Sequence, residues 1–265
     1  MASCEKENGP STKSDSETGT DTTSNNEGTE VAEFPCADDI SWNDQITYGT
    51  VTDIENNTYK TIVIGSQEWM AENLKTRSFN NGDSVSLANE VDSWVALNNQ
   101  SKPACSWYTE ERDSMNIDYS SCYGLSYNGF VIDDTREICP VGWHVPNYDD
   151  VLELEYYIID SLGFAVYSAI PLKSSEGWIT YDGGDGNGED LLGFRGHPFR
   201  LRGQFGAYDE NLNDYLAYYW TSTDSLSFGT LYYHFWGFGA NNTNIIGPNT
   251  FANARNGYGI RCIRD

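Results

Sequence analysis

Ile138-Cys139-Pro140-Val141-Gly142-Trp143-His144-Val145-Pro146-Asn147 is the stretch of sequence that decides the fold. Pro140 and Gly142 favour a turn, since both residues are common where a chain reverses. The three residues that follow, 143–145, favour a short extended piece, and Pro146 ends it. The stretch therefore predicts a turn followed by a short strand.

The residues after this strand predict a helix. Asn147 is a good N-cap, because its side chain accepts hydrogen bonds from the free amides of the first turn. Acidic residues at 149 and 150 lie where the helix dipole favours negative charge. Gly163 favours a helix end. An amphipathic helix at 148–162 follows from the helical spacing of its apolar residues, which are Val151, Leu154, Ile158 and Leu162.

The last residues, Gly259-Ile260-Arg261-Cys262-Ile263-Arg264-Asp265, predict a terminal strand that carries a cysteine. Cys139 lies just before the predicted helix, in the stretch that decides the fold. A disulfide between Cys139 and Cys262 would pin two distant parts of one domain together.

The composition limits the fold class and the partners. Acidic residues outnumber basic ones by 40 to 15, and the formal net charge is −25. Nucleic acids and anionic membrane surfaces attract basic patches, so the charge argues against both as partners. The 18 Tyr and 8 Trp residues, in a chain rich in Gly and Asn, favour many short strands and loops over a helical bundle. The sequence has no apolar run that approaches the length of a membrane span.

The N-terminal residues resemble those of a bacterial lipoprotein. Ala2-Ser3-Cys4 looks like the end of a lipobox, whose cysteine receives lipid, with the signal peptide removed. Residues 5–33 are rich in Ser, Thr, Asn, Gly and Glu, a composition typical of disordered chain. We therefore expect a flexible tether at 1–35 with lipid on Cys4, and one folded domain at 36–265. An ordinary disordered tail is the alternative.

The cysteines favour an exported protein with disulfides. They are scattered and contain no C-x-x-C, which excludes a zinc ribbon and a thioredoxin motif. Cys105 and Cys122 flank a polar segment, 106–121, and we expect a second bridge between them. Cys36 then has no obvious partner.

Seven motifs follow one another between about residue 50 and the end of the chain, and the first has two parts. They are V-T-D-I-x-x-N-T-Y-K-T from Val51 with I-G-x-Q-x-W-M-A-E-N-L from Ile64, W-Y at Trp107, Y-G-x-x-Y-N from Tyr123, C-P-x-G-W-H-V-P from Cys139, G-F-x-x-x-P-x-x-x-R from Gly193, W-T-S-T from Trp220 and R-C-I-R-D from Arg261. In this order they resemble the Fibrobacter succinogenes major paralogous domain family.

The resemblance implies an exported or surface module of a bacterium, often lipid-anchored, with no settled activity. The recurrent cysteine pair of the family corresponds to Cys139 and Cys262. The family is in turn similar to C-type-lectin-like folds and to the formylglycine-generating enzyme, so the resemblance implies an α+β, C-type-lectin-like domain with one or two helices. That enzyme would need a copper-binding cysteine pair near the C-terminus. Only Cys262 lies there, so we do not expect an oxidase.

An acidic, glycine-rich loop at 181–190 is a candidate cation site. Alternating acids and glycines can wrap Ca²⁺, because glycines permit turns and carboxylates supply oxygen ligands. The EF-hand pattern fails, since Asp190 stands where that loop needs Gly and Gly196 where it needs Glu. A solvated acidic loop is the simpler interpretation. Calcium binding is the alternative, with the candidate ligands Asp182, Asp185, Asn187 and Glu189.

The segment 230–238 alternates as a strand whose two faces are both aromatic. One face belongs in the core. The other is either a second core layer or a platform on which sugar rings stack, with a following Asn-rich loop as its polar rim. The candidate ligand-binding residues are Tyr232, His234, Trp236, Asn241, Asn242 and Asn244.

No catalytic constellation stands out. The three histidines lack ligand spacing, and the sequence contains no G-x-S-x-G, H-E-x-x-H or phosphate-binding loop. We therefore expect a non-catalytic binding module of a cell-surface or outer-membrane lipoprotein. It would bind polysaccharide or another surface component through loops in 181–190 and 230–251. The alternative is an envelope structural or assembly protein that binds protein partners.

Overall fold

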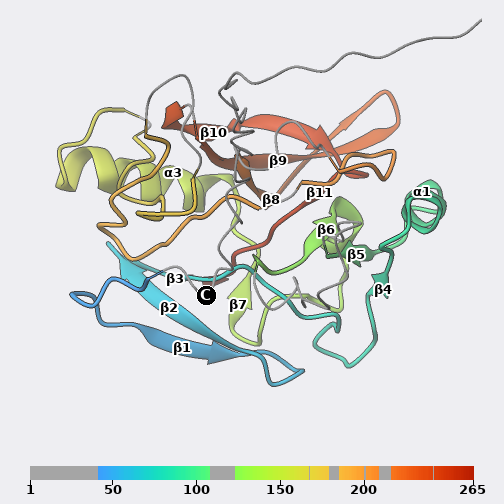
Figure 1. Ribbon diagram of the computed structural model, residues 1–265. Helices are drawn as coiled ribbons and strands as arrows, with labels where there is room; N and C mark the ends of the chain where they lie inside the picture. The colour runs from blue at the N-terminus through green and yellow to red at the C-terminus, as the bar shows by residue number, and fades with distance from the viewer. Residues whose placement is uncertain are drawn as a thin grey trace, which may run out of the picture. The chain divides into compact units, whose positions relative to one another are not determined.

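The structure is a computed structural model that describes residues 41–107, 123–166, 168–178, 185–199, 201–208, 216–240 and 242–265. The predicted tether at 1–35, with Cys4, lies outside these ranges, as does Cys36. The described chain consists mostly of strands in three sheets, with two short α-helices, so the predicted α+β class with few helices is confirmed (Figure 1). Neither of these helices is long and apolar enough to span a membrane.

The first sheet is antiparallel and has the strand order β1-β2-β3-β12-β7. Its hairpin turns at Asn56, whose φ of +67° is a left-handed conformation that Asn tolerates. The last strand of the chain pairs with both β3 and β7, and so lies inside this sheet rather than at its edge. The strands are β1 (Gly49–Thr52), β2 (Thr58–Ile64), β3 (Gln67–Met70), β12 (Ile263–Arg264) and β7 (Trp143–His144).

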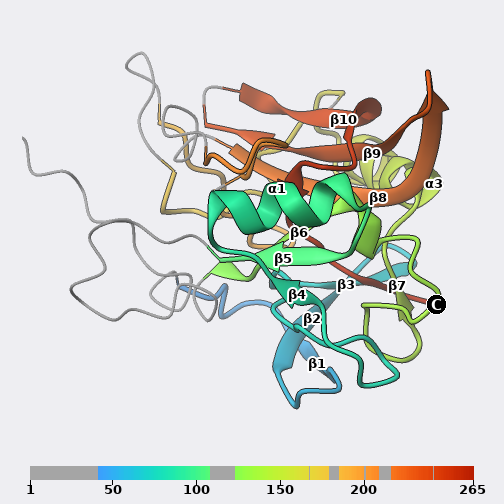
Figure 2. The same cartoon turned by 90° about the vertical axis from the view of Figure 1, so that its right-hand side faces the viewer.

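The second sheet has the order β11-β6-β5-β4 and carries helix α1 (Val91–Asn99) beside it, as Figure 2 shows. Trp94 of α1 is fully buried, and its Nε1 donates to the carbonyl oxygen of Arg255 at 3.2 Å. The short 3₁₀ helix η2 (Gly129–Val131) follows β6. The strands are β11 (Gly257–Tyr258), β6 (Ser126–Asn128), β5 (Ala104–Ser106) and β4 (Ser86–Leu87).

The third sheet holds the three longest strands, in the order β10-β9-β8. The strand predicted at 230–238 is confirmed as the central strand β9 (Thr230–Gly239). It pairs antiparallel with β8 (Leu216–Ser227) and with β10 (Asn242–Asn253), and both pairings contain irregularities in register. Figure 1 shows this sheet beside α3 (Tyr148–Tyr156).

The cap of helix α3 forms as the sequence predicts. The Asn147 side chain accepts from the backbone N–H of Asp149 and Asp150, and the Asp150 side chain accepts from the N–H of Asn147. Together these bonds make a capping box. The carboxyl end differs from the prediction, because 157–161 is π-helical rather than α-helical. The helical segment still ends before Gly163, whose φ is +71°.

One of the two expected disulfides is present. Cys139 and Cys262 are bridged across 123 residues of sequence. A loop of that length corresponds to an entropic stabilisation of about 4–5 kcal/mol in the chain-entropy model. The expected bridge from Cys105 to Cys122 is wrong, because Cys105 is a free, fully buried thiol in β5. Cys105 pairs with Tyr127 of β6 inside the fold. Cys122 lies outside the described residues.

A buried guanidinium lies within the main aromatic cluster. Arg261 is fully buried, and its Nε donates to Oδ1 of Asn73 at 2.8 Å. The other two nitrogens donate to the carbonyl oxygens of Phe194 and, at 3.1 Å, Arg195. The guanidinium carbon lies 4.3 Å from the Phe194 ring centre. Burial lowers the pKa of Arg261, but its N–H groups are bonded and its charge faces an aromatic ring.

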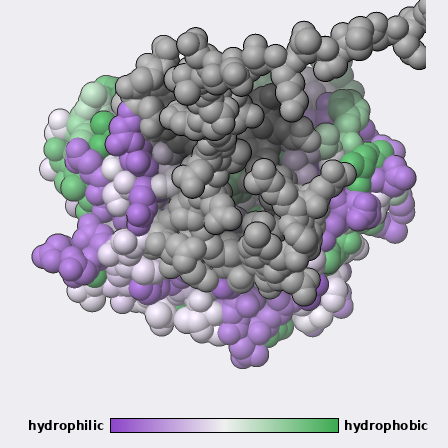
Figure 3. Space-filling model, viewed as in Figure 1, coloured by the Kyte–Doolittle hydropathy of each residue, from purple (hydrophilic) through white to green (hydrophobic). Residues whose placement is uncertain are grey.

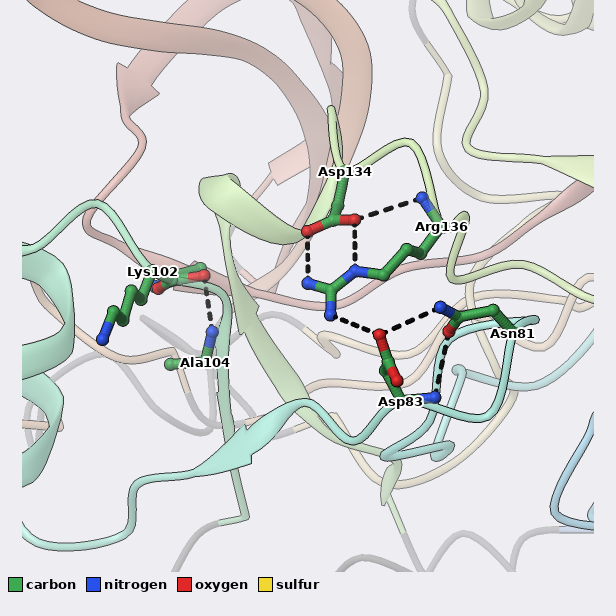
Figure 4. A network of polar contacts seen from close by, with 7 residues as sticks. Asn81, Asp83, Lys102, Ala104, Asp134 and Arg136 are labelled. Atoms are coloured by element: carbon green, nitrogen blue, oxygen red, sulfur yellow. Dashed lines mark hydrogen bonds and ion pairs between the residues drawn. The ribbon is translucent and has the colours of Figure 1, made fainter.

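A surface network ties two loops together near the disulfide (Figure 4). Arg136 donates to Asp134 with nitrogen–oxygen distances of 2.6 and 2.7 Å, and to Asp83 at 3.0 Å. Asn81 also donates to Asp83, at 2.9 Å. The bond from Arg136 lowers the pKa of Asp134. The network holds the loop that contains Asp83 against the segment that leads to Cys139.

His144 of β7 joins the end of the chain to the helix cap. Its Nδ1 lies 2.7 Å from Oδ1 of Asp265, and its Nε2 lies 3.3 Å from Oδ2 of Asp150. These contacts raise the pKa of His144, the bond to Asp150 most of all. The charged imidazolium is therefore favoured in the folded protein.

We expect the His144 contacts to stabilise the fold in acid more than in base. Because folding raises the pKa, the contribution is complete below the unfolded value of about 6.5 and is lost as pH rises through the folded pKa. Urea unfolding should show a larger loss of stability for His144→Gln at about pH 5.5 than at about pH 8.5. An equal loss at both pH values would contradict this role.

Candidate functional site

Four aromatic side chains gather where strands β9 and β10 reach the start of α3. We call them the aromatic strip: Tyr148, Tyr232, His234 and Phe251. The ring of His234 lies 5.8 Å from Tyr148 and 6.1 Å from Phe251, measured between ring centres. Phe251 lies 5.7 Å from Tyr232. The rings meet at angles between 59° and 83°, so they pack edge to face or tilted, the geometry that aromatic pairs prefer.

Three elements position the strip. Alternation along β9 places Tyr232 and His234 on the same side of the sheet. Phe251 of β10 is the direct cross-strand partner of His234. Tyr148 is the first residue of α3, and its backbone N–H donates to Oγ1 of Thr223 in β8 at 2.9 Å. The helix cap and the sheet register therefore fix the strip together.

The strip presents apolar surface beside polar groups. Phe251 is 58% exposed, whereas Tyr148, Tyr232 and His234 are half-buried. The hydroxyl of Tyr148 donates to Oδ1 of Asn249 at 2.9 Å, and that amide is itself exposed. An exposed ring next to hydroxyl and amide groups can stack on an apolar ligand face and bond to polar groups at its rim.

Trp236 is a core residue, so its prediction as a ligand-binding residue is wrong. It is 0% exposed, and its ring centre lies 5.3 Å from that of Tyr219, 5.6 Å from Phe194 and 5.7 Å from Trp69. Tyr233, one of the residues expected on the opposite face, is fully buried too. Both faces of β9 are thus packed here, and the half-buried rings of Tyr232 and His234 lie nearer the strand's start.

The predicted Asn-rich rim is arranged differently from the expectation. Asn242 and Asn244 belong to strand β10 rather than to a loop, and Asn241 lies outside the described residues. Sequence reasoning missed Tyr148, Asn249 and Phe251. Pairing the strand at 230–238 with the apolar and β-branched residues after 245 would have placed Phe251 beside His234, because cross-strand neighbours share a face.

The acidic loop is described from residue 185 onwards, so Asp182 lies outside the described residues. Oδ1 of Asp185 accepts from the backbone N–H of Asn187, and Oδ1 of Asn187 accepts from that of Trp178, both at 2.9 Å. Glu189 is exposed. Within the described ranges, no group of three or more His, Cys, Asp or Glu side chains could hold a metal ion. Calcium binding by the whole loop stays a prediction.

The next residue, Asp190, is buried and belongs to the packing rather than to the acidic surface. Its Oδ1 accepts from the backbone N–H of Arg195 at 2.7 Å. Burial raises its pKa to about 6. The loop therefore ends at a carboxyl group that the fold uses internally.

Truncating Trp236 and Phe251 should separate the core from the candidate site. Trp236→Ala removes a fully packed indole and should lower the free energy of unfolding by about 3–5 kcal/mol. Phe251→Ala removes an exposed ring and should cost less than about 1 kcal/mol. Denaturant unfolding of both variants checks this, and similar losses for the two would show that Phe251 is part of the core.

Comparison with known proteins identifies the family. The family model described as the Fibrobacter succinogenes major domain matches residues 62–264, which is most of the chain. Neither the curated proteins nor the solved structures include a match. The match begins within β2 and runs to β12, and it covers the disulfide and the aromatic strip. The chain belongs to the Fibrobacter succinogenes major domain family.

Proposed function

We propose that the aromatic strip binds carbohydrate and that the protein is a non-catalytic binding module of a bacterial cell surface. The observation that carries this proposal is the exposed ring of Phe251, held in place by neighbouring rings and bordered by the amide of Asn249. Sugar rings have apolar C–H faces and hydroxyl rims, so they fit an aromatic face with polar groups beside it.

The geometry favours a small contact with the ligand. The rings of the strip are tilted against one another, so they do not form one flat platform. One sugar ring would stack on Phe251, and its hydroxyl groups would bond to Asn249 and to Tyr148. The net charge of −25 repels polyanions, so the proposed ligand is a neutral polysaccharide.

The same proposal includes the cellular context. The domain would have a C-type-lectin-like fold and would be exported. Lipid on Cys4 would anchor it to the outer membrane or cell surface through the tether at 1–35. The lipobox-like residues before Cys4 and the polar composition after it support this part.

A polysaccharide array probed with the purified full chain tests the proposal, first with calcium and then with chelator. We expect retention on at least one neutral polysaccharide. Phe251→Ala should weaken it by about 5- to 30-fold, because a stacked ring contributes about 1–2 kcal/mol. Phe205→Ala is the matched control, because Phe205 is also an exposed phenylalanine, 74% accessible. The next residue, Gly206, lies close to Val91, the first residue of α1.

Two results would contradict the proposal for this site. If Phe251→Ala and Phe205→Ala bind as wild type does, the strip is not the binding surface. If retention disappears in chelator, the ligand site belongs to the acidic loop at 181–190.

A second candidate function is an envelope structural or assembly role. The β8–β9 hairpin carries the exposed apolar side chains of Leu226 and Phe228, and the latter is fully exposed. Apolar residues on a hairpin end suit a protein contact better than a glycan. A blank array, together with co-purification of one defined envelope protein, would favour this role.

A further inference from the structure

A pocket lies between the β2–β3 turn and the carboxyl-terminal half of α3, and it shares no residue with the aromatic strip. Its volume is about 240 Å³, and it is lined by Ser66 of the turn and by Glu153, Tyr156, Tyr157 and Asp160 of the helical segment, among others. The volume suits a small molecule or one side chain rather than a drug-sized ligand. The space-filling view shows hydrophobic residues at the molecule's left edge, over α3 (Figure 3).

The back of this pocket is tightly packed, because Gly65 lies directly against the ring of Tyr157. Gly65 has a φ of +63°, and a Cβ at this position would lie 2.8 Å from Cδ2 of Tyr157. Glycine therefore lets the Tyr157 ring pack directly against the turn. Tyr157 also begins the π-helix that runs to Ser161, and such departures from α-helical geometry are frequent at functional sites.

The carboxylates of the pocket come from one continuous helical segment. Glu153 of α3 and Asp160 of the π-helical turn both line the pocket, with Tyr156 between them in the sequence. The hydroxyl of Ser66 donates to Oε1 of Glu153 and fixes that carboxylate at the pocket wall. Tyr156 is 58% exposed, so its ring is available to a ligand.

This lining points to an organic cation. The residues around the pocket include two carboxylates and two tyrosine rings but no Lys, Arg or His. Ammonium groups are attracted both by carboxylates and by the faces of aromatic rings. A metal ion would need more ligands, and in the described part of the chain no cluster of three or more His, Cys, Asp or Glu side chains could supply them.

We propose that this pocket binds an alkylammonium group, with Glu153 and Asp160 supplying charge and Tyr156 and Tyr157 supplying ring faces. The group could belong to a lysine side chain or to a small quaternary amine, since both present the same chemistry. The bond from Ser66 lowers the cost of binding, because it orders Glu153 before the ligand arrives.

Isothermal titration calorimetry of the full chain tests the proposal with three probes. Choline represents a quaternary amine, Nα-acetyl-lysine methylamide represents a lysine side chain, and 3,3-dimethylbutan-1-ol is the neutral isostere of choline. We expect choline or the lysine probe to bind with a Kd of about 1 mM or tighter, and the isostere to bind at least about tenfold more weakly. The stronger of the two cations identifies the source of the ammonium group.

Variants then place the binding in the pocket. Glu153→Gln combined with Asp160→Asn should weaken cation binding by about tenfold or more, because both attractive charges are removed. Asp44→Asn combined with Asp92→Asn removes the same charge from exposed positions outside the pocket and should leave binding unchanged. Tyr156→Leu keeps the charges and should weaken binding severalfold through loss of a ring face.

Three results would overturn the proposal. The first is no binding of either cation up to about 10 mM. The second is equal binding of choline and its neutral isostere. The third is equal weakening by the pocket pair and by the control pair, which would reveal only a general attraction to an acidic protein. The array with Phe251→Ala reports on the aromatic strip, so failure of one proposal is separable from failure of the other.

Discussion

The segment from Gly257 to Arg264 holds the three sheets together, and the rest of the structure depends on it. It begins as β11, paired with β6 of the second sheet. Gly259 then bonds to Tyr218 and Trp220 of β8 in the third sheet, with N–O distances of 3.0 Å. It ends as β12 between β3 and β7 of the first sheet, as the red strand that runs to the C-terminus in Figure 1.

Two side chains of this segment, Cys262 and Arg261, stabilise its position in different ways. The disulfide of Cys262 with Cys139 restricts the conformations of the unfolded chain, because it closes a loop that includes all three strands of the third sheet. Arg261 acts in the folded state, since its guanidinium satisfies two backbone carbonyls and the amide of Asn73 inside the protein. A buried charge is costly to desolvate, and once it is paired in this way its removal leaves several polar groups without partners. The same cluster, through Phe194, Tyr219 and Trp236, supports the sheet from which the aromatic strip projects.

Features set by neighbouring residues were predictable from the sequence, and features set by distant packing were not. The Asn147 cap and the strand at 230–238 depend on local hydrogen bonding and on side-chain alternation. The burial of Trp236 depends on where Phe194 and Trp69 pack, and both residues are far away along the chain. Cys105 shows the same limit, because its place inside β5 removes it from the bridge that its spacing favoured. The pocket had no sequence signal, since it needs the turn at Gly65 beside Tyr157, and these come from separate elements.

Equilibrium unfolding of Arg261→Lys in denaturant tests the central claim, that one buried segment couples the sheets. Lysine keeps the charge but cannot reproduce the three directions in which the guanidinium donates. We predict a loss of about 3–5 kcal/mol in the free energy of unfolding, with fluorescence and far-UV circular dichroism still following one transition. Wild-type stability in this variant would contradict the claim, since the sheets would then hold together without the Arg261 bonds.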